Sequence, residues 1–204
     1  MLCPYRLLLC LCIKLNEWIW SRWCELMKYK RYLDLVKKTG VVWAKIINPK
    51  NVVTAEWVRL KCQYGCNRYG TCLTCPPYSP SPGETEKMLK HYSQALIMVY
   101  DIPGDKYEKA LRKKLRKDVA KLERKIFLDG HYKTFGMACG PCNLCKVCSL
   151  FYPCKFEDLA RPSMEACGID VYQTLANAGY ELKVVKSIKE GCKFCSLILI
   201  EWYW

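Results

Sequence analysis

The chain has 204 residues, 16 of them cysteine, and its 33 Lys and Arg against 19 Asp and Glu give a formal net charge of +14. A chain of this length can build a hydrophobic core without disulfide staples, and a hydrophobic content of 51% excludes an intrinsically disordered protein. No apolar run approaches the roughly 18 to 20 residues that cross a bilayer, which excludes an integral membrane protein.

Residues 1–26 carry four of the cysteines and a short apolar stretch that resembles the core of a signal peptide. No small-residue cleavage pattern follows it, and tryptophans and charged residues come instead. We interpret this segment as a doubtful extension, because Met27 begins a self-sufficient helix that ends at Gly40; a helix lying on a membrane surface is the alternative. Residues 27–204 are then expected to form a single metal-binding domain in the reducing cytoplasm, where closely spaced cysteines bind metal more often than they pair.

The hydrophobic pattern predicts strands and helices that alternate along the chain. Strands are expected over residues 41–49, 52–62, 94–102, 181–188 and 195–202. Helices are expected over residues 27–39, 83–92, 105–128 and 170–179. This order favours an α/β fold, with α+β as the alternative, in which one sheet-based domain carries two inserted cysteine loops at 62–77 and 139–167.

The helix predicted over 105–128 is amphipathic and strongly basic. Apolar residues at 111, 115, 119, 122 and 126 form one stripe, because side chains three and four positions apart share a helix face. The segment has 10 Lys and Arg against 4 Asp and Glu, so it supplies +6 of the net charge. Such a face attracts phosphate groups or an acidic protein, although basic helix faces are often simply solvated.

The first loop places four cysteines, Cys62, Cys66, Cys72 and Cys75, within 14 residues. Glycines let this backbone curl, and Pro76 and Pro77 end the loop. Four thiolates this close together can surround one metal centre. Both zinc, which accepts four sulfurs tetrahedrally, and an iron-sulfur cluster suit such a donor set.

The second loop repeats cysteine every third residue from Cys139 through Cys142 and Cys145 to Cys148, and Cys154 follows. A C-x2-C-x2-C run is typical of ferredoxins, where a tight loop binds three corners of a cubane cluster and a more distant cysteine binds the fourth. We therefore predict a 4Fe-4S cluster here, with structural zinc as the alternative. The predicted ligands are Cys142, Cys145, Cys148 and Cys154, with Cys139 and Cys167 as less certain ones.

Three phrases, YGCNRYGTCLTCPPYSPSPGET, GPCNLCKVC and PCKFEDLARPSMEACGIDVYQT, together resemble a prokaryotic family of predicted metal-binding proteins, domain of unknown function 2284. The resemblance runs from about Tyr29 to Glu201 and implies a cytoplasmic protein with bound metal, an iron-sulfur cluster above all. It implies metal ligands at Cys62, Cys66, Cys75, Cys142, Cys145, Cys148 and Cys154. Because the family often has asparagine where this chain has Cys72, a three-cysteine first site with an open position is an alternative.

Two further groups of residues have open interpretations. Arg161, Ser163, Glu165 and Asp170 can hydrogen-bond cluster sulfurs or a substrate, or else Ser163 and Asp170 cap helices. The C-terminal pair, Cys192 and Cys195, is expected to be a pair of buried free thiols, because an odd spacing on a strand points them to opposite faces.

These observations favour an iron-sulfur protein that transfers single electrons to an acidic redox protein or a partner enzyme, which docks on the helix at 105–128. The two histidines, His91 and His131, lie in no pattern typical of nucleophilic catalysis. A cluster-dependent enzyme with an open iron site and a zinc-structured nucleic-acid-binding protein are the alternatives.

Overall fold

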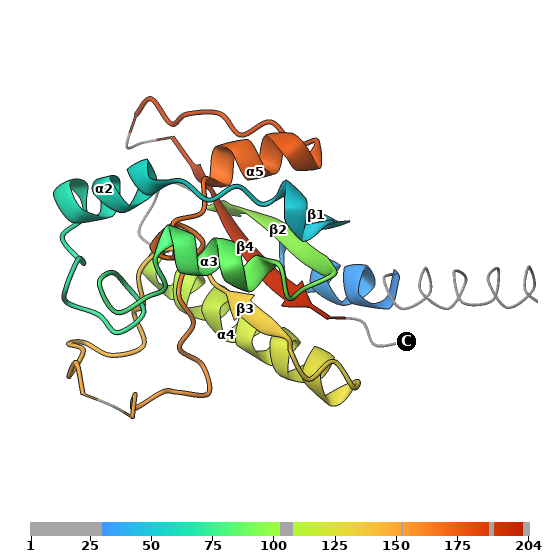
Figure 1. The fold of residues 1–204 in the computed structure, drawn as a ribbon, viewed down its shortest axis with the longest axis horizontal. Coiled ribbons are helices and arrows are strands. Elements are labelled where there is room, and N and C mark those ends of the chain that lie inside the picture. The colour runs from blue at the N-terminus through green and yellow to red at the C-terminus, as the bar shows by residue number, and fades with distance from the viewer. Residues whose placement is uncertain (1–29, 103–107, 152, 188–189, 202–204) are drawn as a thin grey trace, which may run out of the picture.

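The computed structural model describes residues 30–102, 108–151, 153–187 and 190–201 (Figure 1). Residues 1–26, interpreted above as an extension, lie outside this part of the chain. Within it, four strands form one sheet in the order β1-β2-β4-β3, and every neighbouring pair is antiparallel. The strands are β1 (Val41–Ile47), β2 (Gln94–Ile102), β3 (Phe135–Met137) and β4 (Cys192–Ile200). The expected mixture of helices and strands is confirmed, and the antiparallel pairing gives it the α+β form.

Helices cover both faces of this sheet (Figure 1). On one face, Leu175 and Leu89 pack against strand residues such as Ile97. On the other face, Leu115 and Ile126 pack against the alternate strand residues, together with a helix at residues 30–37. The remaining helices are α2 (Glu56–Gly65), α3 (Pro82–Leu89), α4 (Glu108–Leu128) and α5 (Val171–Ala178), with 3-10 turns at Pro49–Asn51 and Glu165–Cys167.

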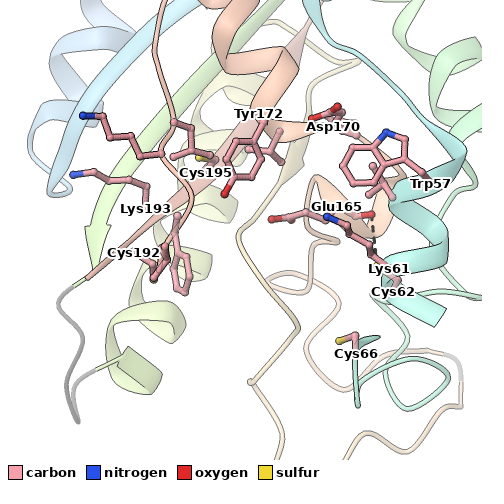
Figure 2. Close-up of a pocket in the computed structure, with 17 residues that line it drawn as sticks. Trp57, Lys61, Cys62, Cys66, Glu165, Asp170, Tyr172, Cys192, Lys193 and Cys195 are labelled. Atoms are coloured by element: carbon pink, nitrogen blue, oxygen red, sulfur yellow. Dashed lines mark hydrogen bonds between the residues drawn. The ribbon is translucent and has the colours of Figure 1, made fainter. Parts of the chain in front are cut away.

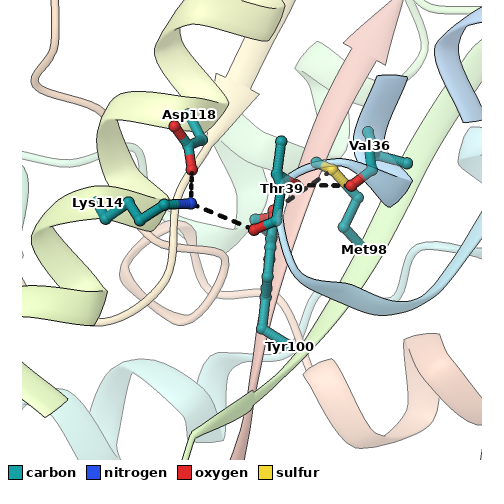
Figure 3. A network of polar contacts seen from close by, with 7 residues as sticks. Val36, Thr39, Met98, Tyr100, Lys114 and Asp118 are labelled. Atoms are coloured by element: carbon teal, nitrogen blue, oxygen red, sulfur yellow. Dashed lines mark hydrogen bonds and ion pairs between the residues drawn. The ribbon is translucent and has the colours of Figure 1, made fainter. Parts of the chain in front are cut away.

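Several predicted elements are confirmed. The stripe on α4 is buried at Leu115, Val119, Leu122 and Ile126, against the sheet. The first helix runs to residue 37 and closes in a turn over 38–40, where the expected terminating glycine, Gly40, has a left-handed φ of +86°. Figure 3 shows how this end is fixed: Lys114 Nζ of α4 donates to the main-chain oxygen of Thr39, 3.4 Å away, and pairs with Asp118.

The strand predicted over 52–62 is wrong, because residues 56–65 form helix α2. The extended part is limited to the start of this segment, where Thr54 forms a single antiparallel bridge to Ile169. From Glu56 on, the chain is helical and buries Val58 alone. The alternating apolar and polar residues therefore belong to a short extended segment and then to a helix. A short apolar run is compatible with both a strand and a helix, which is why the sequence pattern misled here.

The strand predicted over 181–188 is also wrong. Residues 181–187 form no strand, and Val184 is 70% exposed. Position 188 lies outside the described residues. A strand needs a partner, and residues 181–187 pair with none of the described strands, although β4 is paired on one side with β2 and on the other with β3. The short strand β3, which contributes one of these partners, was not predicted because it has only three residues.

Candidate metal centre

The two cysteine loops meet at one end of the molecule (Figure 1). The first follows α2 and the second follows β3, so the fold joins two segments that are about 70 residues apart in sequence. Arg68 of the first loop donates from Nη2 to the main-chain oxygen of Cys142, 3.1 Å away in the second. Five cysteines line the small pocket that lies between the loops: Cys72, Cys142, Cys145, Cys148 and Cys154. The pocket therefore contains all four of the ligands predicted in the second loop.

A tight turn directs Cys72 into this pocket. Gly70, at a φ of +68°, donates its N–H to the oxygen of Pro76 across 2.8 Å, and the N–H of Cys75 donates to the oxygen of Cys72 across 2.9 Å. Cys72 is only 2% exposed as a result. Its sulfur also lies 3.5 Å from the hydroxyl of Thr74.

Cys72 shares hydrogen bonds with Cys142 of the same pocket and with Cys75, which does not line it. Hydrogen bonds from Cys142 and Cys75 to the sulfur of Cys72 lower the pKa of Cys72 and raise the pKa values of both donors. One thiolate is thus stabilised by its thiol neighbours. Since metals bind the thiolate form, Cys72 is the one of these three thiols whose pKa shift favours metal binding.

The other two cysteines of the first loop lie elsewhere. Cys62 lies in the last turn of α2, and Cys66 is the C-cap of this helix. The Cys62 thiol is 3.9 Å from the main-chain oxygen of Glu165. Both cysteines line a second pocket, of about 380 Å³, with Trp57 and Tyr172 (Figure 2). The four cysteines predicted for the first site are therefore separated: Cys72 lines the five-cysteine pocket, Cys62 and Cys66 line the second pocket, and the buried Cys75 lines neither.

The electrostatics of the second pocket reflect its enclosure. Burial raises the pKa of Cys62, and the neighbouring Cys66 raises it further. Glu165 is exposed to solvent and lines the same pocket. The protein atoms around its carboxyl group nevertheless desolvate it, which raises the pKa of Glu165.

The two less certain ligands lie in the hydrophobic core. Cys139 packs on the α4 side of the sheet and Cys167 on the opposite side, and neither is among the residues that line the five-cysteine pocket. Burial raises the pKa of Cys139 to about 11 and that of Cys167 to about 12. Cys195 is also buried, whereas Cys192 is partly buried on the other face of β4, so the expected opposite directions of this pair are confirmed.

A buried arginine that the sequence did not reveal holds the second loop. Arg116 of α4 donates to the main-chain oxygens of Cys139 and Gly140, 3.0 and 2.9 Å away, and of Arg161, 2.6 Å away. It is 0% exposed. Its position beside Leu115 in a basic helix gave no sign that this cation points inward.

Three of the polar residues between positions 161 and 170, at the end of the second loop, have structural roles. Asp170 accepts the N–H of Gln173 and is the N-cap of α5, which confirms the capping interpretation, and Ser163 accepts the N–H of Ala166. Arg161 Nε donates to Glu123 of α4 across 2.5 Å.

Among the described residues, no three Cys, His, Asp or Glu side chains, those of the five-cysteine pocket included, are placed to bind a single metal ion. Nor does any helix in the described ranges combine the length and apolar character of a membrane span.

Comparison with known proteins gives one match. A family model with the description "Predicted metal-binding protein (DUF2284)" matches residues 45–200, from within β1 to the end of β4, and so includes both cysteine loops. No curated protein and no solved structure matches the chain.

Proposed function

Because the chain belongs to the family of predicted metal-binding proteins that its motifs resemble, domain of unknown function 2284, we propose that it holds an iron-sulfur cluster between its two cysteine loops. The observation that carries this proposal is the pocket in which Cys72 joins Cys142, Cys145, Cys148 and Cys154. Four of these five sulfurs suffice for a 4Fe-4S cluster. We assign the four second-loop cysteines as its ligands, with Cys72 as the nearest additional thiol.

The chemistry of the pocket suits such a group. Arg68 lines it, and Arg68 Nε is buried without a hydrogen-bond partner. An unpaired buried donor is costly, and cluster sulfur is an acceptor that would satisfy it. The nearby guanidinium of Arg116 also adds positive charge, which would offset the negative charge of several thiolates.

A cluster in this pocket would supply one-electron transfer. The residues of the protein itself present the thiolates, hold the second loop through Arg116, and attract a partner. Exposed lysines of α4, such as Lys113 and Lys121, lie on the side of this helix away from the core and suit an acidic redox protein or partner enzyme. The proposed location is the reducing cytoplasm, where closely spaced cysteines bind metal more often than they pair.

A cluster-dependent enzyme is a second candidate, which the pocket beside Cys62 and Cys66 favours. A volume of about 380 Å³ lies in the range of small-molecule sites, and aromatic side chains such as Trp57 and Tyr172 line it. If the first-loop cysteines bind a second metal centre with an open position, a substrate in this pocket would lie beside it.

Metal and sulfide analysis tests the proposal. The protein is purified without oxygen, and iron, acid-labile sulfide and zinc are measured per chain together with the visible and electron paramagnetic resonance spectra. We expect a brown, reducible protein with about four iron and four sulfide per chain, or about eight of each if the first loop holds a second cluster. Zinc without sulfide would overturn the redox proposal and leave the zinc-structured nucleic-acid-binding protein, which predicts salt-sensitive retention on DNA or RNA.

A further inference from the structure

A groove of about 770 Å³ opens next to the five-cysteine pocket, between the first turns of α4 and the two cysteine loops. Among the described residues, its lining includes five cations and no Asp or Glu. The cations come from three separate segments of the chain: Arg68 from the first loop, Lys109, Arg112 and Lys113 from α4, and Lys146 from the second loop. The fold thus gathers like charges that are distant in sequence around one concavity.

Carboxylates neutralise other cations of α4 but not the lysines of this groove. Lys114 pairs with Asp118 at 2.7 Å, and Lys125 pairs with Asp129 at 3.8 Å. Among the described residues, Lys109, Lys113 and Lys146 have no such ion pair. No carboxylate among the described residues pairs with these three lysines, so an anion in the groove would be stabilised by all of them.

A bound cluster would not account for these charges by itself. The groove and the five-cysteine pocket share Arg68, Cys142, Leu144 and Cys145, but Lys109 and Lys113 line the groove and not the pocket. These two lysines also lie in the first two turns of α4, where the helix dipole adds to the attraction for an anion.

The lining narrows the class of anion. None of the described residues that line the groove is an aromatic on which a nucleobase could stack. Lysine ammonium groups and arginine forks bind the oxygens of phosphate and carboxylate groups. We infer that the groove binds a compact multivalent oxyanion, a small polyphosphate or polycarboxylate, next to the cysteine loops. This inference goes beyond the proposed function, because the binding does not require electron transfer.

Calorimetric titration of the purified full-length protein with inorganic pyrophosphate and, separately, with citrate tests the inference at constant ionic strength. Saturable binding of one ion per chain is expected, and the tighter of the two ligands identifies phosphate or carboxylate as the preferred group. A Lys109→Gln, Lys113→Gln double variant should bind about tenfold more weakly or worse, since two charge-assisted contacts are lost. The matched control is Lys121→Gln, Arg124→Gln, which removes the same charge from the same helix outside the groove.

Each outcome decides the question. An unchanged affinity in the control, within about twofold, supports a specific groove, whereas equal weakening of both variants would show nonspecific attraction and overturn it. Absence of saturable binding to either anion would also overturn it and leave the lysines to the protein partner proposed above. The visible spectrum and metal content of each variant are recorded in parallel, so that loss of anion binding with intact metal separates this inference from the proposed function.

Discussion

Arg116 donates a hydrogen bond from Nη2 to the main-chain oxygen of Cys139, 3.0 Å away, although its side chain is completely buried. The same guanidinium also binds the oxygen of Arg161. These two acceptors stand at opposite ends of the segment that carries Cys142, Cys145, Cys148 and Cys154. One side chain of α4 therefore closes the base of the second cysteine loop.

Replacing Arg116 with Leu should destabilise the protein strongly. The substitution leaves three main-chain oxygens, one of them in a buried hydrogen bond and two in partly buried ones, without their charged donor. Hydrogen bonds to charged groups contribute about 1.5 to 3 kcal/mol each, so we expect a loss of several kcal/mol in the free energy of unfolding. Urea denaturation followed by circular dichroism measures this loss. Lys121→Leu, an exposed position on the same helix, is the control and should change stability by less than about 0.5 kcal/mol. A loss below about 1 kcal/mol for Arg116→Leu would contradict the structural role described here.

Helix α4, which carries Arg116, shows which structural features can be predicted from the sequence and which cannot. The spacing of Leu115, Val119, Leu122 and Ile126 predicts the buried stripe of α4, because that stripe repeats with the period of the helix. Arg116 breaks the rule that cations lie on the outer face. Its burial depends on carbonyl oxygens from residues 139–161, and a contact across such a distance leaves no local pattern.

Serine substitutions should separate the pocket cysteines from the core cysteines. We expect Cys142→Ser, and Cys145→Ser likewise, to lose most of the bound iron, because serine is a poor substitute for a thiolate ligand. Cys195→Ser changes a cysteine outside the five-cysteine pocket and should retain the wild-type metal content, at some cost in stability. Iron and sulfide analysis and the visible spectrum provide the measurement. Equal loss of iron in all three variants would argue against the proposed ligand set.

Cys72 provides a sharper test of how the first loop takes part. If Cys72 is only a neighbour of the cluster, Cys72→Ser should keep the iron content but change the spectrum or the reduction potential, because hydrogen bonds near a cluster affect its potential. If it is a ligand in place of Cys154, Cys72→Ser should lose iron and Cys154→Ser should not. Parallel measurement of both variants distinguishes the two arrangements.

The separation of Cys62 and Cys66 from Cys72 was missed because residues 52–62 were predicted to be a strand. A strand there would deliver Cys62 to the start of the same loop as Cys72. In the structure the C-x3-C spacing of Cys62 and Cys66 is a helical spacing, so both follow α2 toward Glu165. The turn at Gly70 then carries Cys72 to the other loop. The spacing was a usable signal for helix, but the alternating residues before it obscured that signal.

Gly168 is expected to tolerate no side chain. Its φ of +75° disfavours other residues, and a Cβ atom there would lie 2.4 Å from Cγ and 2.9 Å from Cα of Pro82. Gly168→Ala should therefore cost about 2 to 4 kcal/mol, from strain and displacement of α3. Gly83→Ala is the matched control, since a Cβ there meets nothing within 4 Å and alanine favours a helix. Thermal unfolding of the two variants measures the difference, and similar midpoints would contradict the expected clash.

The buried thiol of Cys195 should make stability fall at alkaline pH. Burial raises its pKa above the ordinary value of 9.0, so on raising the pH above 9 the thiol ionises first in the unfolded chain. The unfolded state then binds fewer protons than the folded state, and the free energy of unfolding decreases by up to about 1.4 kcal/mol per pH unit for this group. Cys195→Val removes the ionisation and should have a shallower slope above pH 9, with no difference in slope between pH 6 and 8. Urea titrations across both ranges measure the slopes, and parallel curves above pH 9 would show that the folded thiol ionises as readily as the unfolded one.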